Sequence, residues 1–185
     1  MTGLVAWRHP KPKGVAGRCI GRTDVPVDPR KAKRLAHRVR SLARREGRAP
    51  EVWTSPLRRG ADVGRWLARW GWSHRVDARL AELDFGTWDG RAWDTVGAAE
   101  VDAWCADFAV NAPGGGESVT ALMARCASFL HDHPDALVVG HGGWLNAASR
   151  VARGLPPPVS AAEWPPACRY TAIWRASSSR GAESQ

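Results

Sequence analysis

Short apolar runs that alternate with longer amphipathic segments constrain the fold of this chain most strongly. The apolar runs at 3–7 and 136–140 have the length and composition of buried strands, and residues 51–54, 74–77 and 168–175 are predicted as further strands. The segments between them are predicted as helices, over residues 29–45, 56–70, 93–109, 119–132 and 143–153, and the first of these repeats apolar residues at helical spacing. Because strands that alternate with helices form parallel sheets covered on both faces, we expect an α/β protein, a three-layer α/β/α sandwich with a mostly parallel central sheet.

Capping residues mark several of these boundaries. Asp28 followed by Pro29 is typical of a helix N-terminus, Gly47 is typical of a helix end, and Ser118 can cap the helix over 119–132. A chain of 185 residues without an internal repeat has the size of one compact domain. We therefore predict a single domain over residues 1–176 and a disordered tail over 177–185, where the residues are small and polar.

The charge of the chain narrows the classes of protein to which it can belong. Lys and Arg number 27 against 18 Asp and Glu, which gives a net charge of +9, and only Lys11, Lys13, Lys31 and Lys33 are lysines. An arginine excess is typical both of nucleic-acid binders and of enzymes that handle anions.

No apolar run approaches the roughly 20 residues of a membrane span. The N-terminus lacks a signal-peptide pattern, and the four cysteines are scattered along the chain. We expect a soluble cytoplasmic protein with reduced thiols and no membrane partner.

The predicted helix over 29–45 carries a polar face that is almost entirely basic. Such a face either binds nucleic acid or is simply solvated. The segment lacks a recognised nucleic-acid-binding motif, and no Phe or Tyr is interleaved with its charges for base stacking. We therefore interpret it as a solvated face and predict no nucleic-acid partner.

Residues with phosphate-binding chemistry follow three of the predicted strands. Strand 3–7 ends at Arg8 and His9, strand 51–54 leads to Arg58, and strand 136–140 ends at His141. Ligands of open α/β sheets bind outside the carboxyl ends of the strands. If these strands are neighbours, two histidines and two arginines converge on one pocket that suits a phosphate dianion.

Six segments in a fixed order give the chain a family resemblance: WRHP (7–10), GRTDVPVD (21–28), TSPLRR (54–59), LAELDFGTWDG (80–90), PGGGES (113–118) and VVGHGG (138–143). Over roughly residues 4–150 the chain resembles the histidine phosphatase (phosphoglycerate-mutase-like) superfamily. The loop that contains proline, followed by Gly-Arg-x-Asp-x-Pro, looks most like the α-ribazole phosphatases of cobalamin biosynthesis. The chain lacks the extra segments of phosphoglycerate mutases, so mutase activity is not expected.

The resemblance implies a role for each matching residue. His9 would be the nucleophile that takes the phosphoryl group, and Glu82 would protonate the leaving oxygen and then activate water. The phosphate oxygens would be bound by Arg8, Arg58, His141 and Arg22. Neighbouring cations would keep His9 neutral, and they would supply the charge that a metal provides elsewhere. No cofactor or metal is therefore expected.

Residues outside these motifs receive more ordinary interpretations. Arg59 is expected to be a solvated helix charge. His131, Asp132 and His133 resemble a metal-binding triplet, but we interpret them as a polar helix end before Pro134.

The substrate is expected to be a small phosphorylated molecule, with α-ribazole 5′-phosphate favoured. Trp88 and Trp144 lie inside catalytic motifs and would wall a pocket for a flat aromatic such as a benzimidazole, and residues 10–20 and 93–112 are further pocket candidates. Two departures from the family pattern, Pro10 in place of Gly and Val15 in place of Asn, leave alternatives open. These are a phosphatase of a sugar phosphate or nucleotide, and a non-catalytic member that binds phosphate or nucleic acid. A homodimer also stays open.

Overall fold

The computed structural model describes residues 3–176 and contains one five-stranded sheet. The strands are β1 (Val5–Arg8), β2 (Glu51–Thr54), β3 (Ser73–Val76), β4 (Leu137–Gly140) and β5 (Ile173–Arg175). They lie in the order β3-β2-β4-β1-β5. β3, β2, β4 and β1 pair in parallel, and β5 runs antiparallel to β1 at the edge. The mostly parallel sheet expected from the sequence is confirmed.

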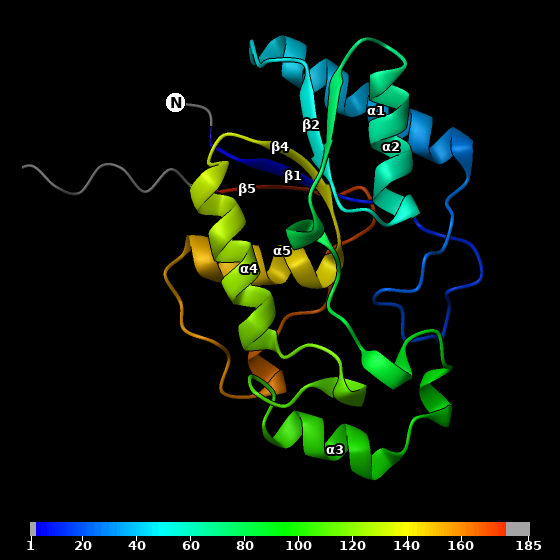
Figure 1. Ribbon diagram of the computed structural model, residues 1–185, viewed down its shortest axis with the longest axis vertical. Helices are drawn as coiled ribbons and strands as arrows, with labels where there is room; N and C mark the ends of the chain where they lie inside the picture. Colours follow the sequence, from blue (N-terminus) through cyan, green and yellow to red (C-terminus); the bar gives the residue numbers. More distant parts are fainter. Residues whose placement is uncertain (1–2, 177–185) are drawn as a thin grey trace, which may run out of the picture.

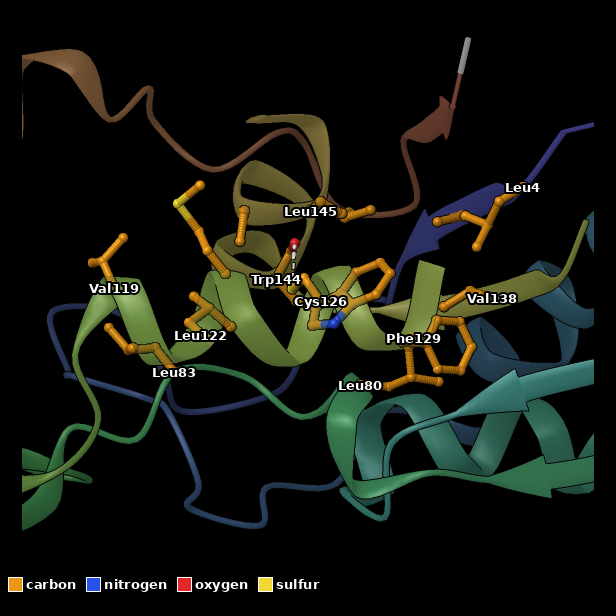
Figure 2. Close-up of a cluster of buried hydrophobic side chains, with 14 of the residues drawn as sticks. Leu4, Leu80, Leu83, Val119, Leu122, Cys126, Phe129, Val138, Trp144 and Leu145 are labelled. Carbon is orange, nitrogen blue, oxygen red and sulfur yellow. Dashed lines mark hydrogen bonds between the residues drawn. The ribbon is translucent and has the colours of Figure 1, made fainter. Parts of the chain in front are cut away.

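Helices cover both faces of this sheet, which confirms the three-layer architecture (Figure 1). They are α1 (Pro29–Arg45), α2 (Arg58–Ala68), α3 (Ala98–Ala106), α4 (Val119–Asp132) and α5 (Gly142–Ala152). α1 and α2 pack on one face around a cluster that includes Trp7, Leu35 and Val63. α4 and α5 pack on the other around Phe129 and Trp144 (Figure 2). α3 covers neither face of the sheet and lies among the loops, away from the strands (Figure 1). Among the described helices, none is long and apolar enough to span a membrane.

The predicted capping residues act as expected. The carboxylate of Asp28 accepts a hydrogen bond from the Arg30 N–H at 2.8 Å, and the hydroxyl of Ser118 accepts one from the Ala121 N–H at 3.1 Å. Gly47 follows α1 with φ of +61°, a conformation that favours glycine. These contacts satisfy backbone groups that a helix end leaves unpaired.

Several boundaries differ from the expectation. The last strand covers only Ile173–Arg175, because a tight turn over residues 169–172 precedes it; there the Ala172 N–H donates to the Arg169 carbonyl at 3.0 Å. α2 begins at Arg58, and α3 is shorter than predicted at both ends. The tail predicted to be disordered, 177–185, lies outside the described residues.

Candidate active site

The carboxyl ends of three neighbouring strands bring the predicted residues together. β1, β4 and β2 are adjacent and parallel, and the chain continues from them into His9, His141 and Ser55. Arg8 and His9 line a cavity of about 540 Å³ at this edge of the sheet. The strands are therefore neighbours, as the predicted phosphate site requires.

His9 is held as a neutral imidazole with a defined tautomer. Its side chain is 4% exposed, and burial, followed by the charges of Arg59 and Arg8, lowers its pKa to about 3 although a bond to the Pro10 carbonyl opposes the shift. Nδ1 lies 2.7 Å from that carbonyl oxygen, and because a carbonyl only accepts, Nδ1 carries the proton and donates it. Nε2 therefore keeps its lone pair, as attack on phosphorus requires.

His141 lies next to His9 but is not among the residues that line the cavity. Its ring is fully buried, and the two ring centroids are 5.0 Å apart. Arg59 Nε donates to Nδ1 at 3.1 Å, so the ring proton is on Nε2, which donates to Ser55 Oγ at 2.7 Å. Burial, followed by the charge of Arg59, lowers the pKa of His141 well below its usual value. With both ring nitrogens bonded to protein groups, the contact between His141 and phosphate stays a prediction.

The burial of the two arginines at the start of α2 is the reverse of what the sequence predicted. Arg59, expected to be solvated, is 1% exposed and lines the cavity. It also donates to the carbonyls of Thr23 (at 2.8 Å) and Gly21. Arg58, expected to bind phosphate, is exposed and does not line the cavity. The cause is helical geometry: Arg59 shares the inward face with Val63 and Leu67, four and eight residues on, whereas its neighbour is turned outward.

Arg8 and Arg22 differ in their relation to the cavity. Arg8 lines it, and its Nε is buried with no hydrogen-bond partner among the described residues. Arg22 is not among the lining residues; its Nη2 lies 3.8 Å from the Glu117 carboxylate. An arginine without a carboxylate partner keeps its charge available for a phosphate dianion. The geometry therefore favours Arg8 over Arg22 as a phosphate contact.

Glu82 lines the cavity at the N-terminus of α5. Its Oε1 accepts from the N–H groups of Leu83 and Trp144 at 3.1 Å each, and its Oε2 accepts from the Gly143 N–H at 3.1 Å. A Cβ at Gly143 would lie 2.5 Å from Oε1, so this close approach requires glycine. The carboxylate is fixed in orientation, while Oε2 keeps one lone pair for a proton.

Asp89 holds the loop that carries Arg59's carbonyl partners. Its carboxylate accepts from the N–H groups of Gly21 at 3.2 Å and Thr23 at 3.0 Å, and from that of Arg22. Asp89 was not among the residues predicted for the site, although it lies in the TWDG segment at 87–90. A short acidic side chain beside a glycine is a signal for such loop anchoring.

Arg125 of α4 holds the segment that carries Glu82. Its guanidinium donates to the Glu82 carbonyl at 3.1 Å and the Ala81 carbonyl at 2.6 Å, and it pairs with the Glu117 carboxylate at 2.7 Å. The sequence did not indicate this role, because Arg125 is one of many arginines on the predicted helices. The side chain's function depends on the packing of α4 against residues 79–82.

The two tryptophans expected to wall the substrate do not line the cavity. Trp144 is fully buried between α4 and α5 (Figure 2), with Nε1 donating to the Arg79 carbonyl at 2.9 Å. Trp88 is 2% exposed and donates to Glu100 Oε2 at 2.9 Å. The prediction was wrong because both side chains belong to packed cores. Residues from 10–20 and 93–112 do contribute, and the aromatic lining comes from Phe85, Trp93, Trp104, Phe108, Trp164 and Tyr170.

The triplet at the end of α4 is engaged in protein contacts. Asp132 accepts from Arg79 Nη1 at 2.6 Å, and the ring of His133 lies against that of Trp53 with centroids 4.1 Å apart. These contacts agree with the interpretation of residues 131–133 as a polar helix end.

The free energy of unfolding is expected to fall as the pH is lowered from 7 to 5. The pKa of His9 is about 3 in the folded state against 6.5 for an ordinary histidine, so between these values only the unfolded state binds the proton. This stabilisation is complete above pH 6.5 and is lost as the pH falls. His9 alone accounts for about 2 kcal/mol between pH 7 and 5, and His141 shifts in the same direction.

Urea unfolding at the two pH values measures this effect. The His9→Gln variant is expected to lose about 2 kcal/mol of the pH dependence. Equal stability of the wild-type protein at pH 7 and pH 5 would contradict the assignment of a neutral buried His9.

A buried neutral histidine beside Arg8 and Arg59, at the carboxyl ends of the strands of an α/β/α sandwich, is an arrangement that suits a phosphate ester. The histidine phosphatase superfamily (branch 1) matches residues 4–179. The chain belongs to this superfamily.

Solved structures agree with this assignment. A mycobacterial glucosyl-3-phosphoglycerate phosphatase in complex with VO3 is 28% identical, with a TM-score of 0.74 over 94% of this chain and 90% of that chain. A mycobacterial hydrolase is 29% identical, with a TM-score of 0.70 over 93% and 89%. A phosphoserine phosphatase from Entamoeba histolytica, in complex with 3-phosphoglyceric acid, shares the fold at 20% identity, with a TM-score of 0.74 over 94% and 89%. A search of curated proteins found no match. The family and the phosphatase neighbours support a phosphatase activity.

Proposed function

We propose that the protein is a metal-independent phosphomonoesterase that works through a phosphohistidine intermediate on His9 Nε2. The observation that carries the proposal is the fixed tautomer of His9, whose Nδ1 donates to the Pro10 carbonyl at 2.7 Å. Nε2 attacks the phosphorus atom and the bond to the ester oxygen breaks. Arg8 and Arg59 offset the charge spread over the phosphoryl oxygens.

Glu82 completes the proton balance of both steps. Its carboxyl group gives a proton to the leaving oxygen, because an alkoxide leaves poorly without one. The resulting carboxylate then takes a proton from the water that attacks the phosphohistidine, and inorganic phosphate departs as His9 is regenerated. The three backbone N–H groups at Leu83, Gly143 and Trp144 fix the carboxylate for this exchange.

The aromatic lining supports a phosphomonoester with a flat aromatic part, and α-ribazole 5′-phosphate is the proposed substrate. Six aromatic side chains surround a cavity of about 540 Å³, which is large enough for a nucleoside-sized leaving group. Aromatic faces bind flat rings by stacking. Arg18 and Asn146, which also line the cavity, could supply polar contacts to a ribose.

A phosphorylated sugar acid is the second candidate. It is favoured by the 28% identity to the glucosyl-3-phosphoglycerate phosphatase and by Arg18 in the cavity lining, which suits a carboxylate.

A panel of phosphomonoesters assayed in excess EDTA tests these proposals through kcat/KM. We expect hydrolysis of an aryl phosphate to persist with EDTA, and α-ribazole 5′-phosphate to exceed the other esters. A preference for glucosyl-3-phosphoglycerate would select the second candidate. Similar kcat/KM values for all esters would contradict α-ribazole 5′-phosphate as the substrate. Binding of phosphate or nucleic acid without hydrolysis of any ester would indicate a non-catalytic member.

Replacing Glu82 by glutamine is expected to slow turnover in proportion to the basicity of the leaving group. The amide keeps the shape of the side chain but has no acidic proton to give. An alkyl phosphate should lose about 10²–10⁴-fold in kcat/KM, whereas an aryl phosphate with an acidic phenol should lose far less. The kcat/KM values of a series of phenyl and alkyl esters measure this slope. Equal losses for all leaving groups would contradict the role of Glu82 as the acid.

A further inference from the structure

The guanidinium of Arg8 is held by a carbonyl oxygen and an aromatic ring. Nη1 donates to the Cys168 carbonyl, and Cζ lies 3.9 Å from the centroid of the Tyr170 ring. Within residues 3–176, no carboxylate lies within ion-pair distance of Arg8. A carboxylate would orient the side chain as well, but it would cancel the charge that attracts a phosphate dianion.

The start of α5 also packs closely against this guanidinium. A Cβ on Gly142 would lie 3.3 Å from both Cζ and Nε of Arg8. With this contact and the ring of Tyr170, the guanidinium has little freedom to turn. Nε is buried without a hydrogen-bond partner among the described residues, so its orientation depends on the packing around it.

The backbone ties Tyr170 to the same residue. The Thr171 N–H donates to the Arg8 carbonyl at 3.0 Å, and the Arg8 N–H donates to the Ala172 carbonyl at 3.0 Å. Thr171 has φ of +61°, which is costly for a β-branched residue. This strained turn directs the Tyr170 ring toward the site, where it lines the cavity and lies 5.6 Å from the ring of His9.

We propose that Tyr170 is a positioning residue, which fixes the guanidinium of Arg8 for the phosphoryl group without neutralising it. The inference rests on the phosphate-ester function proposed above. The attraction between the cation and the ring face supplies orientation, and because the ring is uncharged, the full charge of Arg8 remains for the ligand. The relevant part of Tyr170 is its ring face, and the hydroxyl is dispensable.

Binding of inorganic phosphate by calorimetry, beside kcat/KM for an aryl phosphate, tests this role. Tyr170→Leu is expected to weaken phosphate binding and to lower kcat/KM by about tenfold. Tyr170→Phe keeps the ring face and is expected to stay within about twofold of wild type in both measurements. Tyr170→Met, with a longer side chain, takes the place of the leucine variant if that variant does not fold.

Trp72→Leu is the matched control, since it removes a half-buried ring that packs against the α1–α2 core, away from the cavity. It should lower the melting temperature and leave phosphate affinity unchanged. Equal losses in Tyr170→Phe and Tyr170→Leu would show that the hydroxyl carries the effect and would overturn the proposal, as would wild-type affinity in Tyr170→Leu. Phosphate binding needs no turnover, so failure of the phosphatase proposal would appear separately, as binding without hydrolysis.

Discussion

Replacing His9 by alanine is expected to lower kcat for every phosphomonoester by at least about 10⁴-fold. The variant loses the atom that forms the covalent bond, and no other described histidine of the site can substitute. His141 does not line the cavity, and its Nδ1 and Nε2 are already hydrogen-bonded to Arg59 and Ser55, respectively. Removing the imidazole leaves only the electrostatic contribution of the arginines, which orients the ester but supplies no nucleophile.

The measurement is turnover of an aryl phosphate in excess EDTA, together with quenching of each enzyme in alkaline detergent after brief exposure to a substrate labelled in its phosphoryl group. The wild type should carry an acid-labile, base-stable label, and the His9→Ala variant should carry none. His37→Ala is the control, because His37 is an exposed histidine on α1 and its loss should leave both readouts unchanged. Substantial turnover by His9→Ala would refute the phosphohistidine mechanism.

The fold could be predicted from the sequence because its signals are local. The run at 136–140 is apolar and short, and Asp28 and Ser118 carry their capping chemistry in the side chain itself. The length of β5 was less accessible, since the turn at Thr171 is fixed by hydrogen bonds to Arg8, a residue more than 160 positions earlier. A contact over that separation leaves no periodicity in the local sequence.

Site residues could be predicted from the sequence where they directly follow the carboxyl end of a strand. Arg8 and His9 line the cavity, as expected for residues at a strand end, and Glu82 lines it too, although only the family resemblance of its segment pointed to that residue. Trp88 and Trp144 were misassigned because position inside a motif does not say whether a side chain faces the ligand or the core behind it. Tyr170 gave no signal at all, since its role depends on the cation that it covers.

Replacing Arg59 by methionine is expected to lower kcat/KM by about 10²–10³-fold, the loss typical of removing one charged donor from a preorganised site. Its neighbour provides a nearly ideal control: Arg58→Met removes the same charge one residue away, on the exposed side of α2. That variant is expected to stay within about twofold of wild type, because an exposed charge acts through screened, high-dielectric surroundings. The two variants have the same net charge, so any general effect of the basic surface on substrate attraction cancels between them.

The consequences of Arg59→Met should also extend beyond phosphate binding. The guanidinium satisfies the carbonyls of Gly21 and Thr23 and the Nδ1 of His141, and unpaired buried acceptors cost about 1–3 kcal/mol each. We therefore expect a lower melting temperature in Arg59→Met and an unchanged one in Arg58→Met. Inhibition by vanadate separates the two causes, because lost phosphate binding raises the inhibition constant even at temperatures where the variant is fully folded. If Arg58→Met instead loses activity while Arg59→Met retains it, then Arg58 is the phosphate ligand and the inward face of α2 serves packing alone.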